Sequence, residues 1–238
     1  MAEALQPILE HMWFYPPDST PETTQPGVGI ITTTNATILV DAGNGPRHAR
    51  QIRTALRQMD APPVQYVLYT HHHWDHTFGG QVWTGSLIAA HDQCRALLLD
   101  RYGSHPWNAH AIQEQASLNP ARAPVLRAID RAVDDWSTFR LALPHITFSH
   151  RMILEVDDLT LTLEHIGGQH AADSMIIHAG SVLFLGDCYY PPPHLRQPGD
   201  TPDYAMMEML LEHPVEIYID AHHGPMSRTD LEQRLTHR

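Results

Sequence analysis

The apolar residues of this chain occur in short runs separated by turn-forming residues, a pattern typical of many short strands. The segment 28–41 (VGIITTTNATILVD) has two β-rich halves around Thr34 and Asn35, which predicts a hairpin or two successive strands. Residues 64–69 (VQYVLY) are largely apolar, as expected for a strand buried on both faces. Further strands are expected at 81–90, 151–156, 159–166, 174–178, 182–185 and 215–220.

Helical segments follow each of the two blocks of strands. A helix is expected at 46–59, where Pro46 suits the first turn, and another at 227–237, where Ser227 suits the N-cap. Helices are also expected at 92–100 and 202–212. Two blocks of strands, each followed by helices, indicate an α/β fold in which two sheets pack face to face with helices outside, an αββα sandwich. We therefore expect one domain over the whole chain, residues 1–238.

Residues 103–140 differ in character and are predicted to be a helical insertion in this domain. Within them, the apolar residues of 122–140 recur at helical spacing and form one stripe of Val125, Ile129, Val133 and Trp136. Such a stripe is typical of core packing, and a lid that covers the substrate is the alternative.

The composition limits the classes of function. The formal net charge is −12 with histidines neutral, and there is no basic stripe, so neither nucleic-acid binding nor a polybasic membrane contact is expected. No apolar run approaches the ~20 residues that a membrane span needs. The N-terminal residues MAEALQPILEH lack the basic and apolar regions of a secretory signal. With Cys94 and Cys188 as its two cysteines, the chain fits a reducing compartment, and we expect a cytoplasmic protein that acts on a small molecule.

The N-terminal arm contains four large apolar residues in a row. They precede a Pro- and Thr-rich stretch, 16–26, which predicts an extended loop. The pattern leaves three roles for the four residues: lining a substrate cleft, forming a homodimer contact, or packing in the core. They are Met12, Trp13, Phe14 and Tyr15.

The 19 histidines are the unusual feature of the composition, and some of them occur in dense local groups. The densest group, His71-x-His73-x-Asp75-His76, directly follows the buried strand 64–69. In an extended segment, residues two apart point the same way, so His71 and His73 can bind one ion together. Asp75 and His76 lie just beyond and can face a second ion. Imidazole and carboxylate ligands suit zinc, and also iron or manganese.

This group resembles the H-x-H-x-D-H signature of the metallo-β-lactamase superfamily. Four further segments resemble elements of the same superfamily and occur in the family's order. They are Leu39-Val40-Asp41-Ala42-Gly43, Gly167-Gly168-Gln169-His170-x-x-Asp173-Ser174, Phe184-Leu185-Gly186-Asp187 and Ala221-His222-His223-Gly224-Pro225.

The resemblance implies a site for two zinc ions. By position, the ligands of the first ion would be His71, His73 and His170, and those of the second would be Asp75, His76 and His223. Asp187 would bridge the two ions, and Asp41 would hydrogen-bond a ligand loop.

The sequence departs from the family pattern at two ligand positions. Gln169 separates Gly168 from His170, and Ala221-His222 stands where one glycine is usual, so that His222 is the alternative to His223. Beside the ligands, His72 is expected to face away from the first ion. Cys188 is expected to pack beside Asp187 without binding a metal, a ligand role being the alternative.

The resemblance also implies a reaction. Two ions would activate water for hydrolysis, with Asp75 beside the second ion as a catalytic residue. Tyr190, three residues after Asp187, resembles the tyrosine with which acyl-homoserine lactonases of the family hydrogen-bond the substrate carbonyl. An ester or lactone hydrolase is therefore the leading hypothesis, and a β-lactamase is the alternative. A metal-binding regulatory protein without turnover is the alternative of another class.

Overall fold

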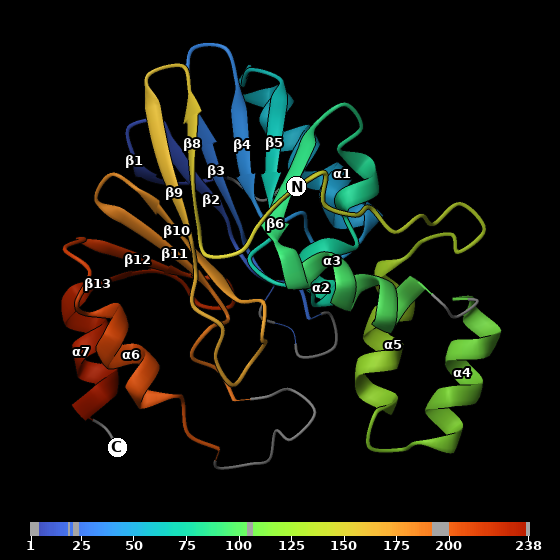
Figure 1. Cartoon of the computed structure of the whole chain (residues 1–238). Helices are drawn as coiled ribbons and strands as arrows, with labels where there is room; N and C mark the ends of the chain where they lie inside the picture. Colours follow the sequence, from blue (N-terminus) through green and yellow to red (C-terminus); the bar gives the residue numbers. More distant parts are fainter. Residues whose placement is uncertain (1–4, 19, 21–23, 104–106, 192–199, 237–238) are drawn as a thin grey trace.

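Two β-sheets face each other in the computed structural model, which describes residues 5–18, 20, 24–103, 107–191 and 200–236 (Figure 1). The first sheet is antiparallel over its first four strands and parallel over the rest. Its strands, in spatial order, are β1 (Gln6–Leu9), β2 (Met12–Tyr15), β3 (Val28–Thr32), β4 (Thr37–Val40), β5 (Val64–Leu68), β6 (Leu87–His91) and β7 (Ile146–Phe148).

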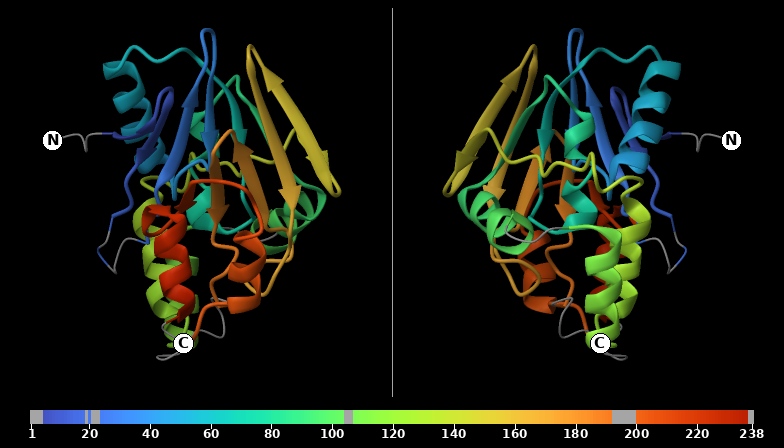
Figure 2. Two further views of the ribbon diagram at one scale, coloured as in Figure 1. Left: turned by 90° about the vertical axis from the view of Figure 1, so that its left-hand side faces the viewer. Right: turned by 90° about the vertical axis from the view of Figure 1, so that its right-hand side faces the viewer.

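The second sheet is antiparallel except where β11 and β12 run parallel. Its spatial order is β13 (Gly224–Ser227), β12 (Ile217–Asp220), β11 (Val182–Gly186), β10 (Met175–Ala179), β9 (Leu159–His165) and β8 (Arg151–Val156). The turned views in Figure 2 show the blue strands of the first sheet and the yellow-to-orange strands of the second as two layers.

The main core lies between the sheets because alternate residues of each strand point to the same face. Ile38 and Val40 of β4 point inward, as do Ile177 of β10 and Phe184 of β11. The other faces of the sheets are covered by helices. The helices are α1 (Pro46–Gln58), α2 (Trp74–Thr77), α3 (Asp92–Leu98), α4 (Ala109–Leu118), α5 (Ala123–Ala132), α6 (Tyr204–Leu210) and α7 (Arg228–Thr236), with a 3₁₀ turn at Gly80–Val82 and a π-helical turn at Leu99–Gly103.

The outer helices complete the four layers that the strand pattern predicts. Ile52 of α1 and Leu98 of α3 pack on the first sheet, and Met207 of α6 and Leu231 of α7 pack on the second. The predicted αββα sandwich is therefore confirmed. Among the described residues, none of the helices has the length and apolar character that a membrane crossing requires.

The predicted insertion contains the helix pair α4 and α5, but the predicted helix over 122–140 was too long. Helix α5 ends at Ala132, and its buried face is centred on Leu126 and Ile129, whereas Val125 is 38% exposed. Trp136 lies beyond the helix and packs in the aromatic cluster that joins the insertion to Trp74 and Phe78.

Other differences concern short edge elements. The N-terminal arm forms β1 and β2, and Met12, Phe14 and Tyr15 of β2 are buried in the core. The strand expected at 81–90 begins only at Leu87, because a 3₁₀ turn comes first. Strand β13 was not predicted, because Pro225 within four residues is unusual for a strand and is tolerated at a sheet edge.

Candidate metal centre

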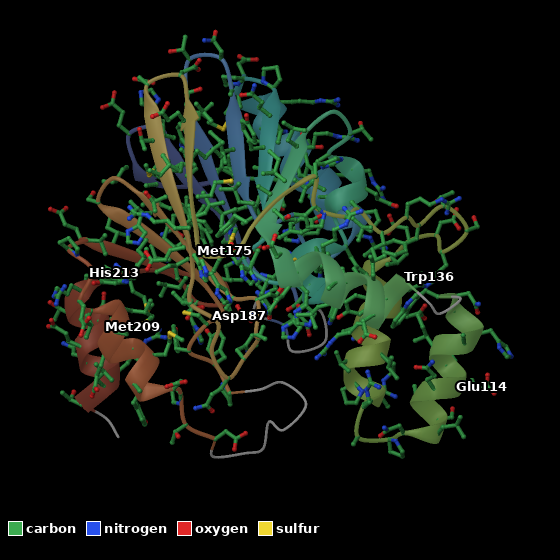
Figure 3. All side chains as sticks on the ribbon, viewed as in Figure 1. Glu114, Trp136, Met175, Asp187, Met209 and His213 are labelled. Carbon is green, nitrogen blue, oxygen red and sulfur yellow. The ribbon has the colours of Figure 1, made fainter. Side chains whose placement is uncertain are left out.

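The candidate ligands follow the ends of strands that meet at one end of the sandwich. Residues 71–76 come shortly after β5, Asp187 follows β11 and His222 follows β12. His170 lies in the loop that leads into β10. In Figure 3, Asp187 lies near the lower ends of the sheets, with Met209 of α6 to its left and Trp136 of the insertion to its right.

Three histidine nitrogens form the first group of ligand atoms. The distance from His71 Nε2 to His73 Nδ1 is 2.8 Å, and the distance from His73 Nδ1 to His170 Nε2 is 3.0 Å. These separations are close to the edges of about 3.3 Å of a zinc tetrahedron with bonds of about 2.0 Å. Burial is the main cause that lowers the pKa of all three side chains, so the imidazoles are neutral, as zinc ligands must be.

A second group lies beside the first and combines one carboxylate with two imidazoles. Asp75 Oδ2 is 3.7 Å from His76 Nε2 and 3.7 Å from His222 Nε2. Asp187 connects the groups: its Oδ2 is 3.4 Å from His170 Nε2 and 3.1 Å from His222 Nε2, while its Oδ1 is 3.5 Å from His76 Nε2. Asp187 therefore lies between the two groups, the position expected of a bridging ligand.

The residues of this site fit metal ions, as two buried atoms show. His76 Nε2 and Asp187 Oδ1 are both buried without a hydrogen-bond partner, which is costly for polar atoms away from water. Burial alone would lower the pKa of His76, but the charges of Asp187, Asp41 and Asp75 raise it well above its usual value. This part of the site is therefore rich in negative charge and suits a cation.

Asp41 fixes the loop that carries the H-x-H-x-D-H residues, as the resemblance implies. Its Oδ1 accepts the backbone N–H of Thr70 at 2.8 Å, and its Oδ2 lies 2.7 Å from His76 Nδ1. Since a carboxylate only accepts, His76 Nδ1 keeps its proton for Asp41, and Nε2 is the nitrogen that would give up its proton to bind a metal. The backbone of Asp41 has a φ of +69°, a conformation that Asp and Asn adopt more readily than other side chains.

The structure brings His222, and not His223, to the second group. The backbone N–H groups of both histidines donate to Asp220 Oδ1, at 2.8 Å and 3.0 Å. In the resulting turn, the side chain of His222 points to Asp187, whereas His223 Nδ1 lies 2.6 Å from the hydroxyl of Tyr190. Of the two alternatives, the structure therefore places His222, and not His223, among the side chains that could hold a metal ion.

Tyr190 lies next to the site, but its hydroxyl has partners in the protein. It donates to Asp220, whose two carboxylate oxygens are both 2.7 Å away. Its ring centre is 6.2 Å from that of His170. The geometry thus places the phenol at the edge of the site and engages it with Asp220 and His223.

Two neighbours of the ligands lie as the sequence predicts. His72 points away from the first group, and its Nδ1 is 2.7 Å from Asp173 Oδ1. Cys188 is fully buried among apolar residues, and burial raises the pKa of its thiol well above the usual value. It belongs to none of the three ligand groups found among the described residues.

No role was predicted from the sequence for Asp173 or Asp220. Both carboxylates are fully buried and hydrogen-bonded to histidines of the ligand segments, Asp173 to His72 and Asp220 to His222 and His223. The signal for Asp220 was its position two residues before His222, since an aspartate can accept backbone N–H groups two and three residues later.

Fold and site together define a class of proteins, and comparison with known proteins gives the same class. The family model of the metallo-beta-lactamase superfamily matches residues 24–229, so the chain belongs to this superfamily. No curated protein is significantly similar in sequence.

Solved structures of the superfamily have the same fold. A metallo-beta-lactamase from Pontibacter korlensis is 16% identical with a TM-score of 0.66, and the match covers 98% of this chain and 96% of that one. A metallo-beta-lactamase family protein from Thermus thermophilus is 19% identical with a TM-score of 0.65 over 96% and 78%. The sec-alkylsulfatase Pisa1 from Pseudomonas sp. is 15% identical with a TM-score of 0.68 over 98% of this chain and 40% of that one. At these identities the similarity shows the fold alone.

Proposed function

We propose that this protein is a hydrolase that binds two zinc ions and cleaves an ester or lactone. One observation carries the proposal: two groups of ligand atoms lie side by side and share the buried carboxylate of Asp187. With Asp187 shared between the ions, each ion would have three ligands of its own, and because catalytic zinc can expand to five-coordinate, a position is left for water or substrate.

The chemistry of such a pair of ions is the polarisation of a carbonyl oxygen and the lowering of the pKa of a water molecule to near neutrality. The residues of the chain position the reactants. His71, His73 and His170 would hold the first ion, and Asp75, His76 and His222 would hold the second. The carboxylate of Asp187 would keep the two ions at a fixed separation.

Asp75 is the residue best placed to move a proton. Its carboxylate is buried among the proposed ligands, and burial raises its pKa. Its Oδ2 is 3.7 Å from the Nε2 atoms of both His76 and His222, which is too far for a hydrogen bond to either. We propose that it accepts the proton of the attacking water and returns it to the leaving alcohol.

The choice of an ester or lactone rests on the position of Tyr190 beside the site. Because its hydroxyl is engaged with Asp220 and His223, a contact with the substrate carbonyl would require that these bonds be shared. The proposed substrate class is therefore compared with two others. One is the β-lactam, and the other is an alkyl sulfate, because a structural neighbour is an alkylsulfatase.

The test is a panel of rates with the zinc-loaded protein. We would measure hydrolysis of a lactone, an aryl ester, a thioester, a β-lactam, a phosphodiester and a secondary alkyl sulfate. His73→Ala removes a proposed ligand, and His150→Ala is the matched control, because His150 is exposed in the turn before β8. We expect a lactone or ester rate that His73→Ala abolishes and His150→Ala retains.

The other outcomes have equally definite meanings. A metal-dependent rate on the β-lactam or the sulfate alone would retain the hydrolase and replace the substrate class. No rate on any of the six compounds, with zinc bound, would refute the hydrolase and favour a metal-binding protein without turnover.

A further inference from the structure

We propose that the buried carboxylate of Asp220 is a positioning residue that couples the segment after Asp187 to the turn of His222 and thereby sets the affinity for the second zinc ion. The inference rests on the proposed two-zinc site. It assigns a role to a residue that touches neither ion in the proposed ligand set.

Asp220 Oδ1 organises the turn that carries His222. It accepts the backbone N–H of His222 at 2.8 Å and that of His223 at 3.0 Å. Both bonds are local, so they fix the direction in which the side chain of His222 leaves the backbone. That side chain then reaches Asp187 Oδ2 at 3.1 Å and faces Asp75 at 3.7 Å.

The same carboxylate holds the segment that follows Asp187. The hydroxyl of Tyr189 donates to Oδ2, and the hydroxyl of Tyr190 lies 2.7 Å from both oxygens. Arg234 of α7 donates to the Tyr189 hydroxyl at 3.1 Å and lies 3.8 Å from Asp220 Oδ2. Because the two tyrosines come directly after Asp187 and Cys188, these bonds tie the bridging carboxylate to the turn of His222.

The position of Asp220 in the sheet explains why one side chain can do this. Asp220 ends β12 and Asp187 follows β11, and these strands are parallel neighbours in which Gly186 is paired with Asp220. The ligands Asp187 and His222 therefore come from adjacent strand ends. Asp220 is fully buried between them, where its hydrogen bonds do not compete with water.

The coupling acts mainly on one half of the site, because His222 belongs to the second group alone, whereas Asp187 also lies 3.4 Å from His170 Nε2 of the first group. Asp187 and His222 are in direct contact at the second group of ligand atoms, whereas the ring nitrogens of His71 and His73 contact each other and His170. Partners that orient metal ligands typically contribute 10- to 100-fold to affinity. Loss of the Asp220 carboxylate should therefore weaken the affinity for the second ion by about 10- to 100-fold, and the affinity for the first ion by less.

The test measures two stepwise zinc dissociation constants with a competing chromophoric chelator, which does not depend on activity. The variant is Asp220→Asn, which keeps the size of the side chain but places an N–H₂ group against N–H and O–H donors. The control is Asp157→Asn, since Asp157 also accepts several hydrogen bonds, from Thr33 and Asn35, in the turn between β8 and β9 at the other end of the sheets (Figure 1).

We expect Asp220→Asn to raise mainly the second zinc dissociation constant. Asp157→Asn should leave both dissociation constants unchanged. A second variant, Tyr190→Phe, removes one hydroxyl and should show a smaller loss in the same direction, and it serves if Asp220→Asn does not fold. Far-UV circular dichroism of the metal-free proteins reports whether each variant is folded.

Two results would overturn the inference alone: unchanged constants in the folded variants, or an equal loss at both constants, which is the result of a general structural role. A wild-type protein that binds fewer than two zinc ions would overturn the two-zinc proposal together with the inference. Failure of the inference is thus distinguishable from failure of the proposed function.

Discussion

Asp41 offers a direct test of how the site prepares His76 for a metal ion. The substitution Asp41→Asn keeps the size of the side chain and suits the backbone φ of +69°, so its effect comes from the lost charge and acceptor. The amide oxygen can still accept the N–H of Thr70, which Asp41 Oδ1 accepts at 2.8 Å. The amide N–H₂ then faces His76 Nδ1, which lies 2.7 Å from Asp41 Oδ2 in the wild type.

The expected loss of affinity for the second zinc ion follows from the tautomer of His76. Facing an N–H₂ donor, Nδ1 becomes an acceptor, the proton moves to Nε2, and Nε2 no longer offers a lone pair. Restoring the metal-binding tautomer breaks the hydrogen bond from the amide and leaves two buried donors facing each other, which costs about 1–3 kcal/mol. At about 1.4 kcal/mol per tenfold, we expect a roughly 5- to 150-fold weaker second zinc site.

The assay is the stepwise zinc titration, accompanied by urea unfolding of the metal-free protein. We expect the second dissociation constant to rise while the first changes little, because the Thr70 bond that precedes His71 is retained. Metal-free Asp41→Asn should also be less stable by about 1–3 kcal/mol, since a buried charged hydrogen bond is lost. Unchanged second-site affinity in a folded variant would refute the tautomer argument.

Three further predictions concern catalysis, pH and packing. Asp75→Asn should lower the hydrolysis rate by about 100-fold or more without unfolding the protein, as steady-state kinetics and circular dichroism will show. Burial lowers the pKa of His48 to about 3, so the folded protein excludes a proton that the unfolded chain binds below about 6.5, and stability falls as the pH falls. Between about pH 7.5 and 5.5 the metal-free wild type should therefore lose about 1.4 kcal/mol more than His48→Asn in urea unfolding. In α5, Leu126→Ala should cost about 2–5 kcal/mol and Val125→Ala under about 1 kcal/mol, because the first side chain is buried and the second is 38% exposed.

The sandwich could be predicted from the sequence because its central strands have strong local signals. The segment 64–69 is apolar and bounded by Pro63 and a polar cluster, and the structure has β5 there. The N-terminal strands lack such signals: the turn between β1 and β2 has His11 at a φ of +63°, where glycine or asparagine would be usual. Strand β2 is defined by pairing with β3, a contact that the local sequence does not reveal, and β1 pairs with β2 in turn.

The predicted stripe of α5 was wrong at Val125, which is exposed, and correct at Ile129 and Val133, which are buried. Periodicity finds a stripe of apolar residues, but alanines contribute to the buried face of a helix as well, and Ala123, Ala128 and Ala132 are buried here. The helix ends at Ala132, whose carbonyl packs against Gly45 so closely that a Cβ at that glycine would lie 2.2 Å from the carbonyl oxygen. This contact is distant in sequence and therefore absent from any local pattern.

The same distinction between local and distant contacts explains which ligands of the site could be predicted from the sequence. The group of four ligands in residues 71–76 is local, and a strand followed by a turn is enough to bring its side chains together. The choice between His222 and His223 is not local, because both follow the same strand and both are histidines. It depends on Asp220, which accepts both backbone N–H groups, and on Tyr190, which lies against His223 Nδ1. Replacing Tyr190 by phenylalanine would remove one of the two side-chain partners of His223 Nδ1, the other being Asp220 Oδ2 at 3.3 Å, so Tyr190→Phe should leave His223 freer to compete with His222 for the second ion.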